Sequence, residues 1–329
     1  MFFEATHNSE SRLNAAILIA WWFYSGWSGM DQLAAMRAFR RVVETGSFTA
    51  AAAELNKSHT IVSRQVRQLE LQLGAQLLNR TTRRFALTEA GQEYYERSRQ
   101  IIDQIDDAAQ AVSAHQARPS GMLRINAPMA FGTLELAQWL PQFILANPQL
   151  SVDLVCNDRL VDVIEEGFDV ALRLTRSLPD STLVAKGLAR CEILLAASPA
   201  YLQRHGVPQQ PSDLAQHNCL TYTLAQKSNE FQFHAADGSE HTVNVRGTLQ
   251  ANTGIALRSA ALAGLGIAAT SSFIVHEDLR RGDLLQILPD YTMKPRDLYA
   301  IYPQNRHLSP KVRAFVDFAA DWYSTPRWD

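Results

Sequence analysis

The stretch from Phe48 to Gly91, FTAAAAELNKSHTIVSRQVRQLELQLGAQLLNRTTRRFALTEAG, decides the fold of the N-terminal part of this chain. Within it, Val62, Val66, Leu69 and Leu73 recur at the i, i+4, i+7, i+11 spacing of one buried helix face. Apolar residues recur at helical spacing in the two segments before this helix as well. The region therefore predicts three short helices that share one small core.

Polar residues mark the ends of these helices. Ser47 or Thr49 is expected to cap the second helix and Ser58 the third, because a hydroxyl oxygen accepts hydrogen bonds from the free N–H groups of a first helical turn. The segment 80–87 is short, basic and rich in β-forming residues, which is typical of a two-stranded wing. Thr88 is expected to cap a long helix that runs to about residue 118.

The charge of this region differs from that of the whole chain. The 329 residues carry a net charge of -2, but between Asp31 and Glu89 nine basic residues outnumber five acidic ones. Such an excess lets a small domain neutralise DNA phosphates. The nine basic residues are Arg37, Arg40, Arg41, Lys57, Arg64, Arg67, Arg80, Arg83 and Arg84.

The third helix presents polar side chains opposite its predicted buried face. Arg64 is placed to contact guanine, Arg67 to hold phosphate, and the wing arginines to reach a minor groove or the backbone. The alternative is that these residues only form the solvated face of a helical bundle. The predicted DNA-binding residues are Ser47, Thr49, Ser58, His59, Thr60, Ser63, Arg64, Arg67, Arg83 and Arg84.

Strands and helices alternate after a Pro-Ser-Gly linker near residue 120, which predicts a parallel, doubly wound α/β sheet in two lobes. A hairpin is expected to turn at Asp237 and Gly238. The expected strands lie at 123–127, 152–155, 169–174, 192–197, 220–222, 248–251, 266–270, 284–288 and 298–302, and the expected helices at 134–146, 161–166 and 310–323.

The helix-turn-helix residues resemble the signature of the LysR-type transcriptional regulator family. The matching positions are Ser47, Phe48, Ala51, Ala52, Leu55, Ser58, Val62, Ser63, Gln65, Leu69, Glu70, Leu73, Gly74, Leu77, Arg80, Leu87, Thr88, Ala90 and Gly91. The resemblance continues in Pro128, Phe131 and Gly132, in EEGFDVA (165–171) and in AGLGI (263–267), and it covers residues 30 to about 323.

The sequence departs from the family pattern at several positions. The family usually has Gln at the position of His59 and Ser or Pro at that of Thr60, so no operator sequence is carried over. Leu78 replaces a customary Phe, which is an apolar exchange within the core. The family often has Pro near Ser271, and this chain does not.

The resemblance implies a winged helix-turn-helix domain (30–88), a linker and dimerisation helix (89–118), and a two-lobed, periplasmic-binding-protein-like (type 2) effector domain (119–329). Lobe I is expected at about 121–191 and 296–325, and lobe II at about 192–295. The implied protein is a sequence-specific transcription regulator controlled by a small-molecule effector. Its implied partners are double-stranded DNA, an effector such as an organic acid, a second or further copy of the chain, and RNA polymerase.

The effector is expected in the cleft between the lobes, because ligands of open α/β sheets bind at the carboxyl ends of strands. Helix N-termini at such an edge favour anions. The predicted effector-binding residues are Ala127, Pro128, Met129, Phe131, Arg173, Thr175, Tyr222, Asn252 and Thr253. Equally weighted alternatives are that Arg173 pairs with a nearby acid and that Thr253 only caps its helix.

The sequence gives no indication of an enzyme. Motifs for a serine nucleophile, a nucleotide loop, a zinc protease or a dinucleotide site are missing, so no cofactor or metal is expected. Cys156, Cys191 and Cys219 are widely spaced, which argues against a disulfide framework and a zinc site and fits a reducing cytoplasm. A transport solute-binding protein would need an export signal and would lack the basic helix-turn-helix.

The first 29 residues contain an apolar run, AAILIAWWFYSGW (15–27). It is shorter than the roughly 20 residues of a membrane span and lacks the basic start of a secretory signal. We expect an upstream extension without a role in the fold, with the native start at Met30 and no stable membrane association. Weak membrane attachment is the alternative.

Overall fold

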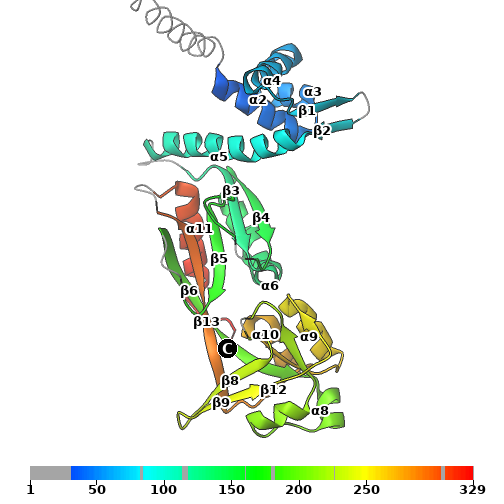
Figure 1. Ribbon diagram of the computed structural model, residues 1–329. Coiled ribbons are helices and arrows are strands. Elements are labelled where there is room, and N and C mark those ends of the chain that lie inside the picture. The colour runs from blue at the N-terminus through cyan, green and yellow to red at the C-terminus, as the bar shows by residue number, and fades with distance from the viewer. Residues whose placement is uncertain are drawn as a thin grey trace, which may run out of the picture. The chain divides into compact units, whose positions relative to one another are not determined.

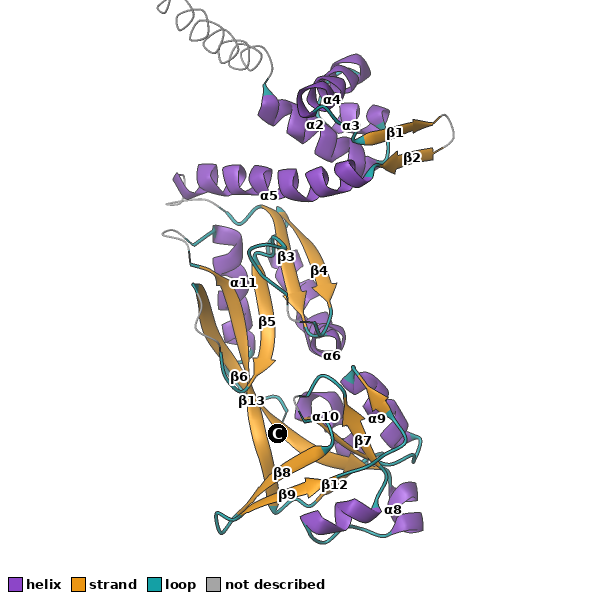
Figure 2. Cartoon of the chain, viewed as in Figure 1, coloured by secondary structure: helices purple, strands orange, loops and turns teal. Residues whose placement is uncertain are grey.

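The computed structural model describes residues 31–81, 84–112, 118–159, 161–178, 182–225, 227–304 and 308–328. The chain divides into two compact units, with the boundary after Ala109. Figures 1 and 2 show their helices and strands. The apolar run near the N-terminus and Arg83 lie outside the described residues.

The N-terminal unit is a winged helix-turn-helix followed by a long helix, as the sequence predicts. Two short antiparallel strands form the wing, with Leu78 opposite Leu87 in register. The elements are α2 (Gln32–Thr45), α3 (Phe48–Glu54), α4 (His59–Leu73), β1 (Leu78–Thr81), β2 (Arg84–Leu87) and α5 (Glu89–Val112).

The core of this unit lies between α2, α3 and α4. Val62, Val66 and Leu69 are fully buried and pack in one cluster with Phe39. The prediction that Leu73 belongs to this buried face is wrong, because Leu73 is 40% exposed. Leu73 is the last residue of α4, where the chain turns away through a left-handed C-cap and leaves no neighbouring helix to cover it.

Hydroxyl caps begin the helices where the sequence predicts them. The Ser47 and Ser58 hydroxyls each accept from a backbone N–H three residues later, both at 3.3 Å, and Thr88 Oγ1 accepts from Gly91 N at 2.9 Å. Thr49 is exposed inside α3 and does not cap it. A Cβ at Gly91 would lie 2.0 Å from the Leu77 carbonyl oxygen, so only glycine lets α5 start this close to the wing.

The C-terminal unit consists of two lobes joined by two long strands, β6 (Leu183–Ala197) and β13 (Tyr291–Pro303), which run from one lobe into the other (Figures 1 and 2). Lobe I contains β3 (Gly121–Ala127), α6 (Met129–Phe131), the π-helix η1 (Gly132–Leu136), α7 (Ala137–Ala146), β4 (Leu150–Cys156), β5 (Val170–Thr175) and α11 (Pro310–Trp322). Lobe II contains α8 (Pro199–His205), η2 (Pro211–Gln216), β7 (Cys219–Tyr222), β8 (Glu230–Ala235), β9 (Glu240–Asn244), β10 (Gln250–Ala251), α9 (Gly254–Leu262), β11 (Ile267–Ser271), α10 (Ser272–Arg281) and β12 (Leu285–Ile287).

The sheet is mixed, which corrects the predicted all-parallel sheet. The main strand order is β10-β7-β11-β6-β13-β5-β3-β4. Within the lobes, β3 pairs in parallel with β4 and β5, and β7 with β10 and β11. The crossing strands are antiparallel to each other and to their other neighbours, β5 and β11. A chain that crosses between lobes once in each direction brings its two crossing strands together antiparallel.

The predicted helix at 161–166 is also wrong, since this segment is a turn. The Asp162 carboxylate accepts from the backbone N–H groups of Ile164 and Glu165, both at 2.9 Å, as at the start of a helix, but only one turn forms because the chain becomes left-handed at Gly167. Gly167, at φ 66°, then leads the chain toward β5. The predicted hairpin at Asp237 and Gly238 is confirmed, because it joins β8 to β9.

The three cysteines are free thiols. Cys191 and Cys219 are buried in the cores of the effector unit, whereas Cys156 is only half-buried. Among the described residues, no cluster of His, Cys, Asp and Glu could hold a metal ion. No helix in the described part of the chain is both long and apolar enough to cross a bilayer.

Lobe I buries a carboxyl group in its π-helix. Glu135 is only 2% exposed. Burial raises its pKa to about 7, while the Trp328 side chain and the positive charge of Arg327 act in the opposite direction. Between its ordinary pKa of 4.5 and this raised value, the folded chain binds more protons than the unfolded chain.

We therefore expect the free energy of unfolding of the effector unit to fall by up to about 3 kcal/mol as the pH rises from about 4.5 to 7. In Glu135→Gln, which cannot ionise, this part of the fall should disappear. Calorimetric melting temperatures at pH 5 to 8 would measure it, with the exposed Glu192→Gln as the control that keeps the wild-type slope. Parallel curves for wild type and Glu135→Gln would show that the carboxyl group does not titrate in this range.

Candidate DNA interface and effector cleft

Helix α4 exposes the polar residues that the sequence assigns to DNA. Opposite the buried Val62 and Val66, the residues Thr60, Arg64 and Arg67 are exposed. His59 and Ser58 are exposed at the start of the helix, while Ser63 is half-buried. The His59 ring lies edge-on to Phe48 with centroids 5.9 Å apart, so the first turn of α4 packs against α3. This face combines hydroxyl, imidazole and guanidinium groups.

The basic residues of α2 serve a different purpose from those of α4. Arg37 and Arg40 pair with Asp106 and Asp103 of α5, the latter pair at 2.6 Å, and Arg41 pairs with acidic residues of its own unit. The pairs of Arg37 and Arg40 hold α5 against α2. Arg37, Arg40 and Arg41 are three of the nine basic residues of this region, and these ion pairs neutralise their charges. Among the described residues, no carboxylate lies within ion-pair distance of Arg64 or Arg67, so these two retain their charge for a partner.

The wing is described only in part. Arg84 lies in β2, with its backbone paired to Thr81, and its side chain is outside the described part of the structure, as is all of Arg83. Ser47 and Ser58 direct their hydroxyl groups to helix N-termini, and Thr49 is exposed on α3. The described DNA-facing side chains therefore come mainly from α4.

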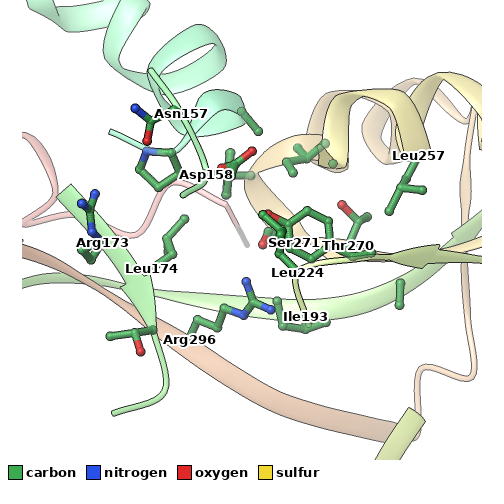
Figure 3. Close-up of a pocket in the computed structure, with 18 of the residues that line it drawn as sticks. Asn157, Asp158, Arg173, Leu174, Ile193, Leu224, Leu257, Thr270, Ser271 and Arg296 are labelled. Carbon is green, nitrogen blue, oxygen red and sulfur yellow. The ribbon is translucent and has the colours of Figure 1, made fainter. Parts of the chain in front are cut away.

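A cavity of about 310 Å³ lies between the two lobes. Figure 3 shows Arg173 and Leu174 on one side, Leu257, Thr270 and Ser271 on the other, and Asp158 and Arg296 between them. Its lining residues are Pro128, Ala130, Asn157, Asp158, Arg159, Arg173, Leu174, Thr175, Ile193, Tyr222, Leu224, Gly254, Leu257, Ala269, Thr270, Ser271, Phe273, Ile274 and Arg296.

The structure brings some of the predicted effector residues to this cavity and leaves others outside it. Pro128, Arg173, Thr175 and Tyr222 line it. The other predicted residues, which are outside the lining, are Ala127, Met129, Phe131, Asn252 and Thr253.

The residues outside the lining have structural surroundings of their own. Ala127 and Phe131 are fully buried in the core of the lobes, and Met129 is 39% exposed. Thr253 caps α9, where its Oγ1 accepts from Ile255 N at 3.4 Å, which is the role of the capping alternative. Asn252 precedes that cap.

Arg173 has the strongest geometry for binding an anion. Its Nη1 donates to Asn126 Oδ1 at 2.6 Å and to the Leu172 carbonyl at 2.9 Å, which fixes the plane of the guanidinium. Its Nη2 is buried and has no hydrogen-bond partner among the described residues. Burial lowers the pKa of Arg173, but a guanidinium stays charged at neutral pH. Among the described residues Arg173 forms no ion pair with a carboxylate; Glu166 pairs with Arg159, and its charge also acts on Arg173 in the direction that raises the pKa of that guanidinium.

The cavity also contains a carboxylate. Asp158 accepts from the backbone N–H of Met129 at 3.1 Å, and burial raises the pKa of its carboxyl group although this hydrogen bond lowers it. Arg296 directs its guanidinium from β13 toward the space beside Asp158 (Figure 3). Three arginines and one aspartate thus share a lining whose other side chains are mostly apolar. This arrangement attracts an anion and also offers one acceptor for a ligand O–H or N–H group.

Several lining residues were missed from the sequence although a signal was present. Asn157 and Asp158 directly follow β4, and Thr270 and Ser271 end β11, so both pairs lie at carboxyl ends of parallel strands. Arg173 was predicted because ligands bind at the carboxyl ends of strands, and the same reasoning applies to β4 and β11. Thr270 Oγ1 and Asn157 Oδ1 are buried without a partner, as Arg173 Nη2 is.

Comparison with known proteins identifies both units. Residues 33–92 match the family described as bacterial regulatory helix-turn-helix protein, lysR family. Residues 116–324 match the LysR substrate binding domain. Two relatives span nearly the whole chain. An HTH-type transcriptional regulator of Haemophilus influenzae is 38% identical over 86% of this chain and 98% of its own. The HTH-type transcriptional activator AaeR of Escherichia coli is 34% identical over 89% and 94%.

Solved structures agree with this assignment. CrgA, a LysR-type transcriptional regulator from Neisseria meningitidis, is 33% identical with a TM-score of 0.59 and covers 91% of this chain and 100% of its own. The virulence activator AphB of Vibrio cholerae is 30% identical with a TM-score of 0.58 and coverage of 88% and 99%. These relatives are regulators rather than enzymes. The chain therefore belongs to the LysR family of transcription regulators, with a helix-turn-helix domain that binds DNA and a substrate domain that binds an effector.

Proposed function

We propose that the exposed face of α4 reads the operator sequence and that a small organic acid in the interlobe cavity controls this binding. The observation that supports the DNA assignment is the contrast on one helix between the fully buried Val62, Val66 and Leu69 and the exposed Arg64. His59, Thr60 and Ser63 lie near the N-terminal half of the helix, which contacts base edges in this motif. Arg67, one turn later, is assigned to phosphate.

Arg64→Ala is expected to weaken binding to the promoter of the protein's own gene by about 1 to 3 kcal/mol and to relax specificity at one base position. Mobility-shift titrations at fixed salt would measure this, with a set of single-base operator variants for the specificity. Arg190→Ala removes the same charge from an exposed site of the effector unit and is the matched control. Equal losses in the two variants, or none in Arg64→Ala, would exclude Arg64 from base recognition.

The protein is proposed to act as a homodimer or a larger homo-oligomer through α5. Ile101 and Ile105 of this helix are 46% and 41% exposed, whereas Ile102 between them packs into the DNA-binding unit. Exposed isoleucines on a long helix are suited to a second copy of the same helix, and a paired domain would meet half-sites about one DNA turn apart. RNA polymerase is a further proposed partner, and the cytoplasm is the proposed compartment.

The effector is proposed to carry a carboxylate on an apolar or aromatic body. Arg173 supports the carboxylate, because its buried Nη2 has no hydrogen-bond partner in the part of the chain that the structure describes. Leu174, Ile193 and Leu257 supply apolar walls, and the volume is at the small end of ligand pockets. Asp158 favours acids that also carry a hydroxyl or amino group. A ligand of this kind would bind most tightly at one particular spacing of the two lobes. It would therefore shift the oligomer toward the conformation with that spacing.

A panel of small acids, including benzoate, hydroxybenzoates and aliphatic hydroxy acids, would test this class in a thermal-shift assay on the full chain. The corresponding amides are the neutral controls. An acid that binds should raise the melting temperature of the effector unit, since ligand binding to the folded state stabilises it. A panel in which the amides stabilise as well as the acids would contradict an anionic effector.

A further inference from the structure

The C-terminal segment Ser324–Trp328, here called the C-terminal strap, folds back over the end of α11. The Ser324 hydroxyl donates to the Asp321 carbonyl at 2.7 Å, and Arg327 Nε donates to the Trp322 carbonyl at 2.8 Å. The Arg327 guanidinium carbon also lies 3.8 Å from the centroid of the Trp322 ring, a cation–π contact. These contacts fix the direction in which the strap leaves the helix.

The strap ends in a buried aromatic cluster. Trp328 is only 7% exposed, although it lies one residue from the end of the chain. Its ring centroid is 5.4 Å from that of Tyr323, 5.8 Å from Phe273 and 6.3 Å from Phe131. Such spacings are those of favourable aromatic pairs. The neighbouring strap residues 324–327 are exposed, so the indole is the part of the strap that is anchored.

This cluster joins the two lobes. Phe131 belongs to α6 of lobe I, Phe273 belongs to α10 of lobe II, and their rings lie 5.5 Å apart. Trp328 packs against both rings, so the strap adds a contact between the lobes besides the crossing strands. Phe273 also lines the effector cavity. The indole is therefore one side chain away from the proposed ligand.

Trp328 also borders a second cavity. It measures about 570 Å³, is lined by residues of β6, α10, β12 and β13, and has Trp328 in its wall. Phe233, Ile287 and Met293 line it farther into lobe II. Without the indole this cavity would extend toward the Phe131–Phe273 contact, because side chains around a deletion relax only in part.

We infer that Trp328 is a positioning residue for effector binding: it clasps Phe131 to Phe273 and so sets the spacing of the lobes across the cavity before a ligand arrives. This contact, here called the clasp, restricts the relative motion of the two lobes before binding. The ligand then loses less free energy in ordering the lobes. The part of the clasp in effector binding rests on the proposed function. The contact between the lobes does not rest on the proposed function, and it can be measured without any ligand.

Hydrogen–deuterium exchange on the full-length chain, without ligand, would test the clasp. In Trp328→Ala we expect exchange in 129–136 and at the start of α10 to become about tenfold faster, since the ring contacts of Trp328 with Phe131 in lobe I and with Phe273 in lobe II are lost. Exchange in β3 and β11, the inner strands of the two lobes, should stay at the wild-type rate. Trp328→Phe keeps an aromatic ring and should restore most of the protection.

Arg327→Ala provides a milder variant that leaves the aromatic cluster intact, loosens the attachment of the strap to Trp322 and removes the positive charge that acts on Glu135. It should speed exchange in the same segments to a smaller extent. Unchanged exchange in Trp328→Ala would overturn the clasp. Faster exchange that includes β3 and β11 would also overturn it, because Trp328 would then only support the fold. Neither result depends on whether the effector is an acid.

Discussion

Replacing Arg173 with alanine is expected to weaken binding of an acid found in the thermal-shift panel by about 2 to 4 kcal/mol, which is roughly 30- to 900-fold. Arg173 lines the cavity, its guanidinium is held in place by Asn126, and its Nη2 is buried without a hydrogen-bond partner among the described residues. Removing one partner of a buried, hydrogen-bonded charge pair costs this much because the other charge is left unpaired. Calorimetric titration of the full chain with that acid would measure the loss.

Two variants make this prediction specific. Arg159 also lines the cavity, but it is paired with Glu166 and is 62% exposed, so Arg159→Ala should change the affinity by less than about threefold. Arg173→Lys keeps the charge and loses the planar fork, and it should fall between wild type and Arg173→Ala. If Arg173→Ala folds, as judged by its melting curve, and binds the acid like wild type, the anion site lies elsewhere.

A second large effect is expected at Asp278, where the loss should be in stability. This carboxylate is fully buried and bonds Arg258 of α9 at 2.5 and 2.7 Å and Arg281 at 2.8 Å. It thereby ties α9, whose first turn borders the effector cavity, to α10. Asp278→Ala leaves Arg258 without its partner and should destabilise the effector unit by about 2 to 4 kcal/mol.

Urea unfolding followed by circular dichroism would show this loss as a lower midpoint for the effector unit. Asp278→Asn retains the volume and part of the hydrogen bonding and should lose less. Glu277→Ala removes the exposed carboxylate that pairs with Arg280 and lies 3.7 Å from His276, and it should stay within about 0.5 kcal/mol of wild type. A wild-type midpoint for Asp278→Ala would mean that the arginines find other partners or water at no cost.

Local patterns predicted the N-terminal unit well because its information is local. The stripe of Val62, Val66 and Leu69 and the caps at Ser47 and Ser58 each depend on residues a few positions apart. Leu73 failed because periodicity does not show where the neighbouring helix stops covering a face. The charge count was also too simple, since it could not show that Arg37 and Arg40 bind acids of α5, some 60 residues later.

The effector cleft was predicted less completely because it is assembled from distant segments. The rule that ligands bind at the carboxyl ends of strands predicted Arg173 and Thr175. If it had been applied to every strand, it would also have predicted Asp158 and Thr270. Arg296 could not be found in this way. It lies on β13, and its position depends on the register of that strand against β6, which shifts between Met293 and Arg296. No short-range pattern encodes such a register.

The path of the chain through β6 and β13 has a consequence for biosynthesis. Lobe I starts at β3 but needs β13 and α11, whereas lobe II is built almost entirely from the residues in between. At about 5 to 20 residues per second, the ribosome needs roughly 5 to 20 seconds between the two parts of lobe I. Lobe II can therefore fold first, while the nascent lobe I exposes the side of its sheet that α11 later covers. A stop codon just before α11 should yield an insoluble product rather than a shorter regulator.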